Sequence, residues 1–322
     1  MDAKRRSILL TFTVLSFAAA VLMGFRYIGE YGYYGILEFA EKNQEAGICR
    51  WISWLFNYPW TDTLVEYACL MGAAFLPVYL LICWLPKDTK EPRALPAKDF
   101  VIGTVMAMGL GYTCNMLGTW INYLISTRLG GSFLDMNPVT EMMESMSPSM
   151  VIYACIVGPV MEELFCRGFL LKRARVFGDW TAVVFTAIIF GLMHGNIAQF
   201  LYATVIGLIL GYVTVKTNSI RSAIGIHIVV NTYNTILGVV EESLFAWGLD
   251  LLAYGVTFAA LGIMLLLIIV GFILAVKYGR LWYRQMLYHD GPPSDDKMFV
   301  FVNPGFLVYL ILCLIEFGYY LK

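Results

Sequence analysis

The sequence predicts an all-α polytopic membrane protein, with about eight to nine transmembrane helices around a membrane-embedded cavity. The first observation is composition: 59% of the 322 residues are hydrophobic and only 14% are charged, whereas soluble domains carry about 25% charged residues. The second is a series of nine apolar stretches, and the third is the placement of basic residues between them. The formal net charge of −1 gives no basic excess, so we expect no nucleic-acid partner.

Each apolar stretch is expected to form one membrane helix, because a span requires about 20 predominantly apolar residues. The stretches lie near residues 7–25, 64–85, 100–126, 150–171, 180–197, 199–215, 222–240, 251–276 and 299–321. The first follows the basic residues 4–6 and is longer than the apolar core of a signal peptide, so we expect a retained anchor. The fifth and sixth are short and are separated only by the polar residues 194–196, which leaves two spans or one re-entrant pair.

The basic residues favour nine spans with a cytoplasmic N-terminus, because short cytoplasmic loops are enriched in Lys and Arg. In that arrangement 16 of the 22 Lys and Arg residues fall on the cytoplasmic side: Lys4, Arg5, Arg6, Lys87, Lys90, Arg93, Lys98, Lys172, Arg173, Arg175, Lys216, Arg221, Lys277, Arg280, Arg284 and Lys297. Five fall on the other side, and Arg167 lies within a span. We therefore expect a multi-pass protein of a bacterial-type plasma membrane.

Three charges interrupt the fourth apolar stretch, which reads GPVMEELFCRGFLL over residues 158–171. A charge inside a bilayer costs about 2.5–3.5 kcal/mol on insertion scales. The presence of Glu162, Glu163 and Arg167 in this stretch therefore requires a structural or functional explanation. Glu163 and Arg167 are four residues apart, on one helix face, and are expected to form an ion pair. Glu162 is rotated by about 100° and is free to face a cavity, which the upstream Gly158-Pro159 kink would open. The alternative is that all three charges form a cluster that only packs helices together.

Two of the three histidines in the chain also lie in apolar stretches. His194 follows Phe190 by four residues, and His227 precedes Asn231 by four residues, so each pair shares a helix face. Either histidine alone is more typical of a packing hydrogen bond than of catalysis, but two of them together with the glutamates favour a site. Glu316, by contrast, lies near the end of the last stretch and is expected to reach the membrane interface.

Helix geometry allows these polar groups to meet. At 1.5 Å per residue, Glu162 and Asn231 lie roughly 15 Å from the basic ends of their stretches, and His227 about 9 Å. His194 lies about 21 Å along a straight helix and is the weakest fit. Glu162 would take a proton from water with help from His194, while His227 and Asn231 would donate hydrogen bonds to an oxyanion. These roles describe a hydrolase site for an amide or an ester.

Zinc is the alternative account of the same residues. Glu162, His194 and His227 are a legitimate zinc-ligand set. The sequence lacks the H-E-x-x-H pattern, and a metal would leave Asn231 without a role. We therefore favour a site that requires no cofactor, with zinc as the alternative.

The motifs themselves resemble those of a known family. The order E-E-x-x-x-R, F-x-x-x-H and H-x-x-x-N on successive apolar segments, within residues 150–235, is similar to the CPBP family. This family includes CAAX prenyl proteases of the Ras-converting type and bacteriocin-processing or immunity enzymes, and is also called Abi. The resemblance implies an intramembrane endopeptidase with an eight-helix-like core and a conical cavity open toward the cytoplasm and the lipid.

The resemblance also assigns roles residue by residue. Glu162 would activate water with the assistance of His194, and His227 with Asn231 would form the oxyanion pocket. The supporting residues would be Glu163, Arg167 and Phe190. The implied partners are membrane lipid and a membrane-associated or lipidated protein or peptide substrate, such as one prenylated at a CAAX-type terminus.

We expect one integral membrane unit with three parts. Residues 1–149 form N-terminal transmembrane helices and outer loops, residues 150–240 carry the three motifs, and residues 241–322 form C-terminal transmembrane helices. The expected function is intramembrane peptide hydrolysis. The alternative is a non-catalytic membrane immunity factor or a transporter component, in which the buried charges line a binding or proton path.

Overall fold

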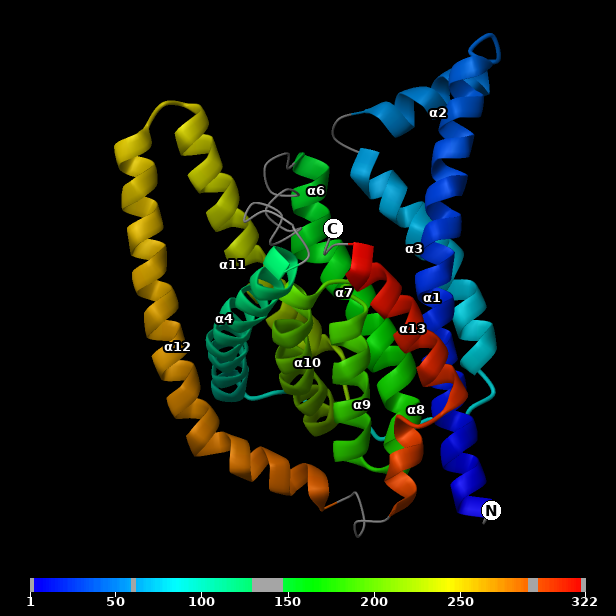
Figure 1. Cartoon of the computed structure of the whole chain (residues 1–322), viewed down its shortest axis with the longest axis vertical. Coiled ribbons are helices and arrows are strands. Elements are labelled where there is room, and N and C mark those ends of the chain that lie inside the picture. The colour runs from blue at the N-terminus through cyan, green and yellow to red at the C-terminus, as the bar shows by residue number, and fades with distance from the viewer. Residues whose placement is uncertain (1–2, 59–61, 129–146, 289–294, 320–322) are drawn as a thin grey trace.

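The computed structural model describes residues 3–58, 62–128, 147–288 and 295–319. Its regular elements over these ranges are all helices, with no β-strand among them (Figure 1). This confirms the all-α class. Each of the nine apolar stretches corresponds to a helix or a continuous helical rod within the described ranges.

The apolar helices differ in whether their length suffices to cross a bilayer. They are α1 (Ala3–Lys42), α3 (Asp62–Ile82), α4 (Ala97–Arg128), the rod of residues 148–177, α9 (Asp179–Leu192), α10 (Ile197–Thr217), α11 (Arg221–Ala246), α12 (Asp250–Leu287) and α13 (Pro304–Tyr319). In the described part of the chain, seven are long and apolar enough to cross a membrane. The other two, α9 and α13, are shorter. The helices α2 (Gly47–Asn57) and η5 (Asp295–Val300) are also short.

The rod of residues 148–177 carries the first motif and is not a uniform α-helix. Its segments are α6 (Pro148–Ile152), the π-helical η2 (Tyr153–Val157), α7 (Gly158–Glu163), the π-helical η3 (Leu164–Leu171), α8 (Lys172–Ala174) and the 3₁₀-helical η4 (Arg175–Phe177). Pro159 lies in the first turn of α7, directly after a π-helical turn, where the wider spiral accommodates a residue without an N–H. π-Helical turns are frequent at functional sites, and Glu162 and Glu163 lie between two of them.

Helices α9 and α10 form a hairpin around the polar residues 194–196. Because α9 has only 14 residues, it spans about 21 Å, less than a bilayer core of about 30 Å. The Asn196 side chain caps α10 by accepting a hydrogen bond from Gln199 N at 2.8 Å, and it donates to His194 O at 3.0 Å. Gly207 lets the two helices approach, since a Cβ there would lie 3.0 Å from Ala187 Cα. Because α9 is short, His194 lies inside the bundle. A straight helix of full membrane length would place it farther from the other site residues.

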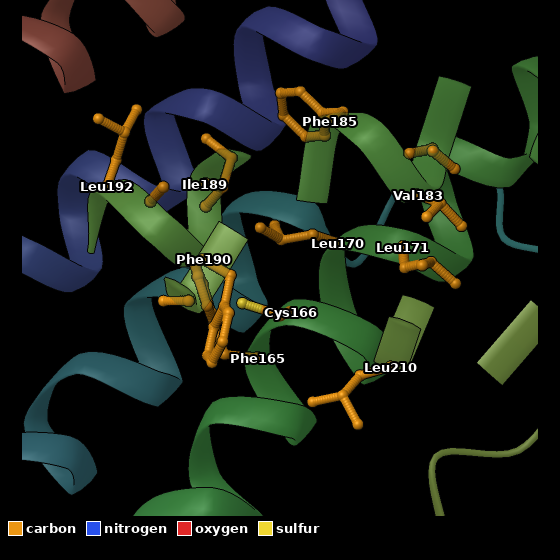
Figure 2. Close-up of a cluster of buried hydrophobic side chains, with 14 of the residues drawn as sticks. Phe165, Cys166, Leu170, Leu171, Val183, Phe185, Ile189, Phe190, Leu192 and Leu210 are labelled. Carbon is orange, nitrogen blue, oxygen red and sulfur yellow. The ribbon is translucent and has the colours of Figure 1, made fainter. Parts of the chain in front are cut away.

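The core around the rod is apolar and closely packed. Figure 2 shows side chains of the rod, such as Phe165 and Leu170, interleaved with Phe185 and Ile189 of α9 and with Leu210 of α10. The Tyr309 hydroxyl of α13 donates to Ile189 O at 3.0 Å. Lipid tails are as apolar as these side chains, so close van der Waals packing holds the helices together. The long α12 packs on α4 at the edge of the bundle and exposes most of its apolar side chains (Figure 1).

The basic segments gather at one end of the bundle. The connection from α3 to α4, residues 83–96, crosses the ends of the rod and of α10. Asp88 N donates to Lys172 O at 2.8 Å, and Arg93 N donates to Thr217 O at 2.6 Å. Positive charges that are far apart in sequence therefore share one end of the bundle.

Candidate active site

One cavity of about 360 Å³ contains all four residues predicted to act chemically. Glu162 comes from α7, His194 from the turn after α9, and His227 and Asn231 from α11. The rest of the lining comes mainly from α4, α10 and α11. Its polar residues are Tyr112, Asn115, Gln199, Tyr202, Asn234 and Thr235.

Glu163 and Arg167 form an ion pair that is completely buried. Arg167 Nη1 lies 2.9 Å from Glu163 Oε1, and both side chains have 0% exposure. Arg167 Nη2 also donates to Gly207 O of α10 at 3.1 Å, and its Cζ lies 4.6 Å from the centroid of the Phe190 ring. The arginine thus connects the rod to both helices of the α9–α10 hairpin.

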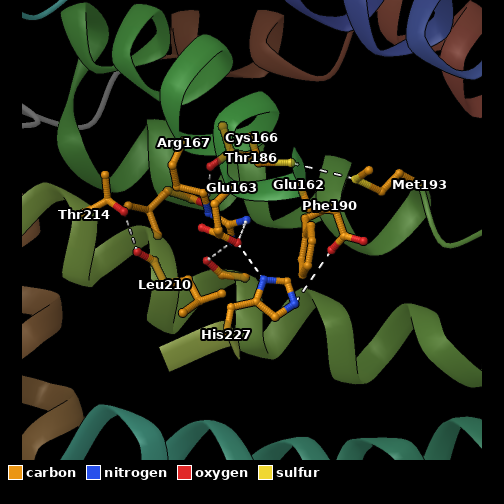
Figure 3. A network of polar contacts seen from close by, with 12 residues as sticks. Glu162, Glu163, Cys166, Arg167, Thr186, Phe190, Met193, Leu210, Thr214 and His227 are labelled. Atoms are coloured by element: carbon orange, nitrogen blue, oxygen red, sulfur yellow. Dashed lines mark hydrogen bonds and ion pairs between the residues drawn. The ribbon is translucent and has the colours of Figure 1, made fainter. Parts of the chain in front are cut away.

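His227 bridges the two neighbouring glutamates. Its Nδ1 lies 3.0 Å from Glu163 Oε1, and its Nε2 lies 3.7 Å from Glu162 Oε2 (Figure 3). Since Glu163 is a carboxylate beside Arg167, it accepts a hydrogen from Nδ1. Nε2 is thereby directed at Glu162 and the cavity.

His194 is oriented in an equivalent way. Its Nδ1 lies 2.7 Å from Phe190 O, and because a carbonyl only accepts, Nδ1 carries the hydrogen and Nε2 remains for the cavity. The Phe190 ring meets the rings of His194 and His227 edge to face, at centroid distances of 4.9 and 5.7 Å. Phe190 is therefore a shared wall that fixes the planes of both imidazoles.

Asn231 is also held in a fixed orientation. Its Nδ2 donates to Ala154 O of η2 at 3.1 Å. An amide nitrogen carries two hydrogens, so this bond leaves a second N–H for a ligand of the cavity.

Several cavity residues were not predicted from the sequence. The Tyr112 hydroxyl donates to Asn234 Oδ1 at 2.8 Å, and Gln199 Nε2 donates to the Tyr202 hydroxyl at 3.2 Å. Tyr202 in turn lies against His194, with ring centroids 6.1 Å apart. With 20 tyrosines in the chain, no local pattern marks the ones that reach the site; only the tertiary packing does.

Glu316 has a contact that the sequence did not predict. Its carboxyl group lies against Gly195, in the turn that carries His194. Oε2 is buried without a hydrogen-bond partner, and the Tyr27 hydroxyl donates to Oε1 at 3.4 Å. Arg26 of α1 is close enough to interact electrostatically with this carboxylate. The first and last apolar helices thus both support the turn at the edge of the cavity.

Substituting Gly195 with alanine is expected to destabilise this turn. Gly195 has φ +71°, and a Cβ there would lie 2.6 Å from Glu316 Cδ. Backbone strain alone costs a non-glycine residue about 1–3 kcal/mol, and the overlap with Glu316 adds to it. Denaturant unfolding in detergent and peptide cleavage measure the two consequences.

Gly248 provides the matched control. It has the same φ of +71°, but nothing lies within 4 Å of its Cβ position. We expect Gly248→Ala to cost only the strain and to leave cleavage unchanged. Adding Glu316→Ala to Gly195→Ala should restore part of the lost stability. Equal costs at the two glycines would contradict the contact between Glu316 and the turn.

The cavity contains side chains of the types that bind zinc, but these side chains are not grouped closely enough to bind one ion. In both imidazoles Nδ1 is held by a backbone or carboxylate oxygen, which is how metal-binding histidines are usually oriented. In the residues that the structure describes, however, no three His, Cys, Asp or Glu side chains are grouped closely enough to hold a metal ion. The metal set Glu162, His194 and His227 is therefore not assembled in this arrangement.

Comparison with known proteins finds similarity in the segment that contributes the motif residues of this cavity. Residues 144–233 match the family model described as "Type II CAAX prenyl endopeptidase Rce1-like". "Putative membrane peptidase YdiL" of Bacillus subtilis (strain 168) is 23% identical over 240 residues, which cover 71% of this chain and 87% of that protein. No solved structure matches the chain significantly. All the motif residues lie within the matched segment, so this multi-pass helical membrane protein is similar, over residues 144–233, to the Rce1-like type II CAAX prenyl endopeptidases.

Proposed function

We propose that this protein is an intramembrane endopeptidase in which Glu162 is the general base that activates water. Its family supports a membrane endopeptidase in general terms. The observation that carries the finer proposal is the division between two adjacent glutamates. Glu163 is buried and bound by Arg167 and His227, whereas Glu162 lines the cavity, with His227 Nε2 at 3.7 Å. Glu162 is thus the carboxylate available to a reactant.

The proposed reaction is the attack of water on a peptide carbonyl. Glu162 takes one proton from a water held with the help of His194, and the water oxygen bonds to the carbonyl carbon. The negative charge then moves to the carbonyl oxygen. As the C–N bond breaks, Glu162 returns the proton to the leaving nitrogen, so the carboxylate is regenerated.

The oxyanion is stabilised by the free N–H of Asn231 and by Nε2–H of His227 in its protonated form. A neutral ring with hydrogen on Nδ1 has no hydrogen on Nε2, so this role requires the imidazolium. The Glu163 carboxylate lies 3.0 Å from Nδ1 of this ring, and the Glu162 carboxylate lies 3.7 Å from Nε2. Preorganised donors of this kind contribute strongly in a low-dielectric site.

The substrate is an extended peptide segment near the C-terminus of a membrane-associated or lipidated protein. A cavity of about 360 Å³ admits a few residues but no folded domain. Its lining combines the polar groups with apolar side chains such as Met108, Ile206 and Val230, which suit an apolar residue or lipid group next to the cut bond. We also propose that the N-terminus is cytoplasmic, because the basic residues share one end of the bundle.

Reconstituted protein tests this function. Vesicles that contain the full chain should cleave members of a library of prenylated and unmodified peptides, and a Glu162→Ala/His194→Ala variant should not. We expect activity to survive a strong chelator. Loss on chelation with recovery on addition of zinc would instead assign Glu162, His194 and His227 to a metal. Retention of the wild-type cellular phenotype by the double variant would support the non-catalytic alternative.

A further inference from the structure

A second pocket of about 510 Å³ lies at the basic end of the bundle, away from the proposed chemistry. It is enclosed by the end of the rod, residues 87–92 of the α3–α4 connection, and residues 214–221 between α10 and α11. Its charged residues are Lys87, Asp88, Lys90, Lys172, Arg173, Arg175 and Arg221. None of its residues lines the cavity of Glu162.

The pocket carries more positive charge than its own acid can neutralise. Six of the charged residues are basic and only Asp88 is acidic. Two of the cations are paired with acids: Arg175 lies 2.8 Å from Asp88 and 2.7 Å from Asp179, and Lys90 lies 3.7 Å from Asp88. Arg173 is buried and donates to backbone carbonyls, those of Ile82 at 2.8 Å and Phe169 at 3.0 Å. Its charge is therefore not neutralised by these bonds.

Lys87 and Lys172 add two cations with freedom to engage a ligand. Among the residues described, no ion pair joins either of them to a carboxylate. Lys87 is exposed and Lys172 is half-buried. An incoming anion would face both side chains without having to displace an acidic partner.

The first turn of α11 also points its positive end at the pocket. Ile220 is the N-cap and provides no side-chain hydrogen bond, although Ser219 Oγ accepts from Arg221 N at 3.3 Å, and all three residues line the pocket. This helix has 26 residues, so its dipole adds partial positive charge at the same place where the basic side chains gather.

The wall of the pocket is built by specific hydrogen bonds. Asp88 N donates to Lys172 O at 2.8 Å, and Asn218 Nδ2 donates to Glu91 O at 3.0 Å. The second bond depends on Asn218, which has a left-handed backbone with φ 52°. These bonds fix the α3–α4 connection over the helix ends, so the pocket exists before any ligand binds.

We propose that this pocket binds the phosphate of an anionic phospholipid headgroup. Basic pockets between helices on the cytoplasmic side bind such headgroups. A lipid is favoured over a free anion because the pocket also includes Tyr79 and Phe169, whose ring centroids lie 6.0 Å apart. Aromatic rings at this level are typical of the membrane interface and offer an apolar surface to the glycerol and upper acyl chains.

The test compares lipids on the purified full chain in detergent. We expect phosphatidylglycerol to raise the melting temperature and to remain bound in native mass spectrometry, and phosphatidylcholine with the same acyl chains to do neither. A Lys87→Gln/Lys172→Gln variant should bind phosphatidylglycerol roughly 30-fold more weakly, since each Lys or Arg near an anionic headgroup contributes about fivefold. The melting temperature without lipid shows that this variant is folded.

The matched control removes two positive charges from the basic end of the bundle, outside the pocket. Lys277 and Arg280 of α12 are exposed and lie outside the pocket. We expect Lys277→Gln/Arg280→Gln to retain the lipid effect. An equal loss in the two double variants, or equal stabilisation by both lipids, would overturn the proposal. Equal stabilisation by inorganic phosphate, abolished by the pocket variant, would assign the pocket to free phosphate and overturn the lipid.

Discussion

The Glu162→Gln variant is expected to cleave peptide about 10²–10⁴-fold more slowly than the wild type, the usual contribution of a general base. Glutamine keeps the size of the side chain but cannot accept a proton from water. The loss should appear in kcat, because the cavity that receives the peptide keeps its shape. Initial rates over a range of peptide concentrations in proteoliposomes separate kcat from KM.

The fold should survive this substitution. The Glu162 side chain is 22% exposed, and it lies 3.7 Å from His227 Nε2 without a close ion pair. We therefore expect the melting temperature to change little. The matched control is Glu241→Gln, the same substitution on α11 outside the cavity, which should leave both kcat and KM unchanged. A Glu162→Gln protein with wild-type kcat would remove the proposed general base.

Most of the helical framework was predictable because the membrane makes hydropathy decisive. A span must satisfy its backbone hydrogen bonds internally, so an apolar stretch of sufficient length becomes a helix. The ends of the helices were less predictable. Helix α1 continues to Lys42, far beyond the apolar stretch 7–25, since its second half packs on α2. There the Tyr33 ring stacks on Phe56 at 4.8 Å and its hydroxyl donates to Phe56 O at 3.2 Å, contacts that no hydropathy pattern contains.

The same distinction applies to the site. Spacing within a helix predicted the pairing of Glu163 with Arg167, because i and i+4 side chains are neighbours. Spacing could not predict that Glu163 also binds His227, which lies 64 residues later in the chain. The support of the His194 turn by Glu316 depends on the path of the last helix across the bundle. The contacts between helices depend on tertiary packing. The order of the motifs predicts that their residues belong to one site, but not which side chains touch there.

Replacing Arg167 with methionine is expected to destabilise the protein by about 3–5 kcal/mol, the usual cost of removing one partner of a buried ion pair. Glu163 would remain at 0% exposure, and among the described residues its hydrogen bond to His227 Nδ1 would remain. The bond from the guanidinium to Gly207 O and its stacking on Phe190 would be lost as well. Denaturant unfolding in detergent measures the loss.

Two further variants separate the charge pair from a general loss of packing. Glu163→Gln/Arg167→Met removes both charges and should recover most of the stability, because a buried pair can be replaced by uncharged residues of similar size at little cost. Its cleavage should stay low, since the carboxylate that orients His227 through Nδ1 at 3.0 Å is replaced. Arg5→Met breaks an ion pair whose arginine is 49% exposed and should cost only about 0–1 kcal/mol. An Arg167→Met protein as stable as Arg5→Met would show that the buried pair does not hold the rod to the hairpin, whereas a stable but inactive double variant would place the catalytic contribution of Glu163 in its bond to His227.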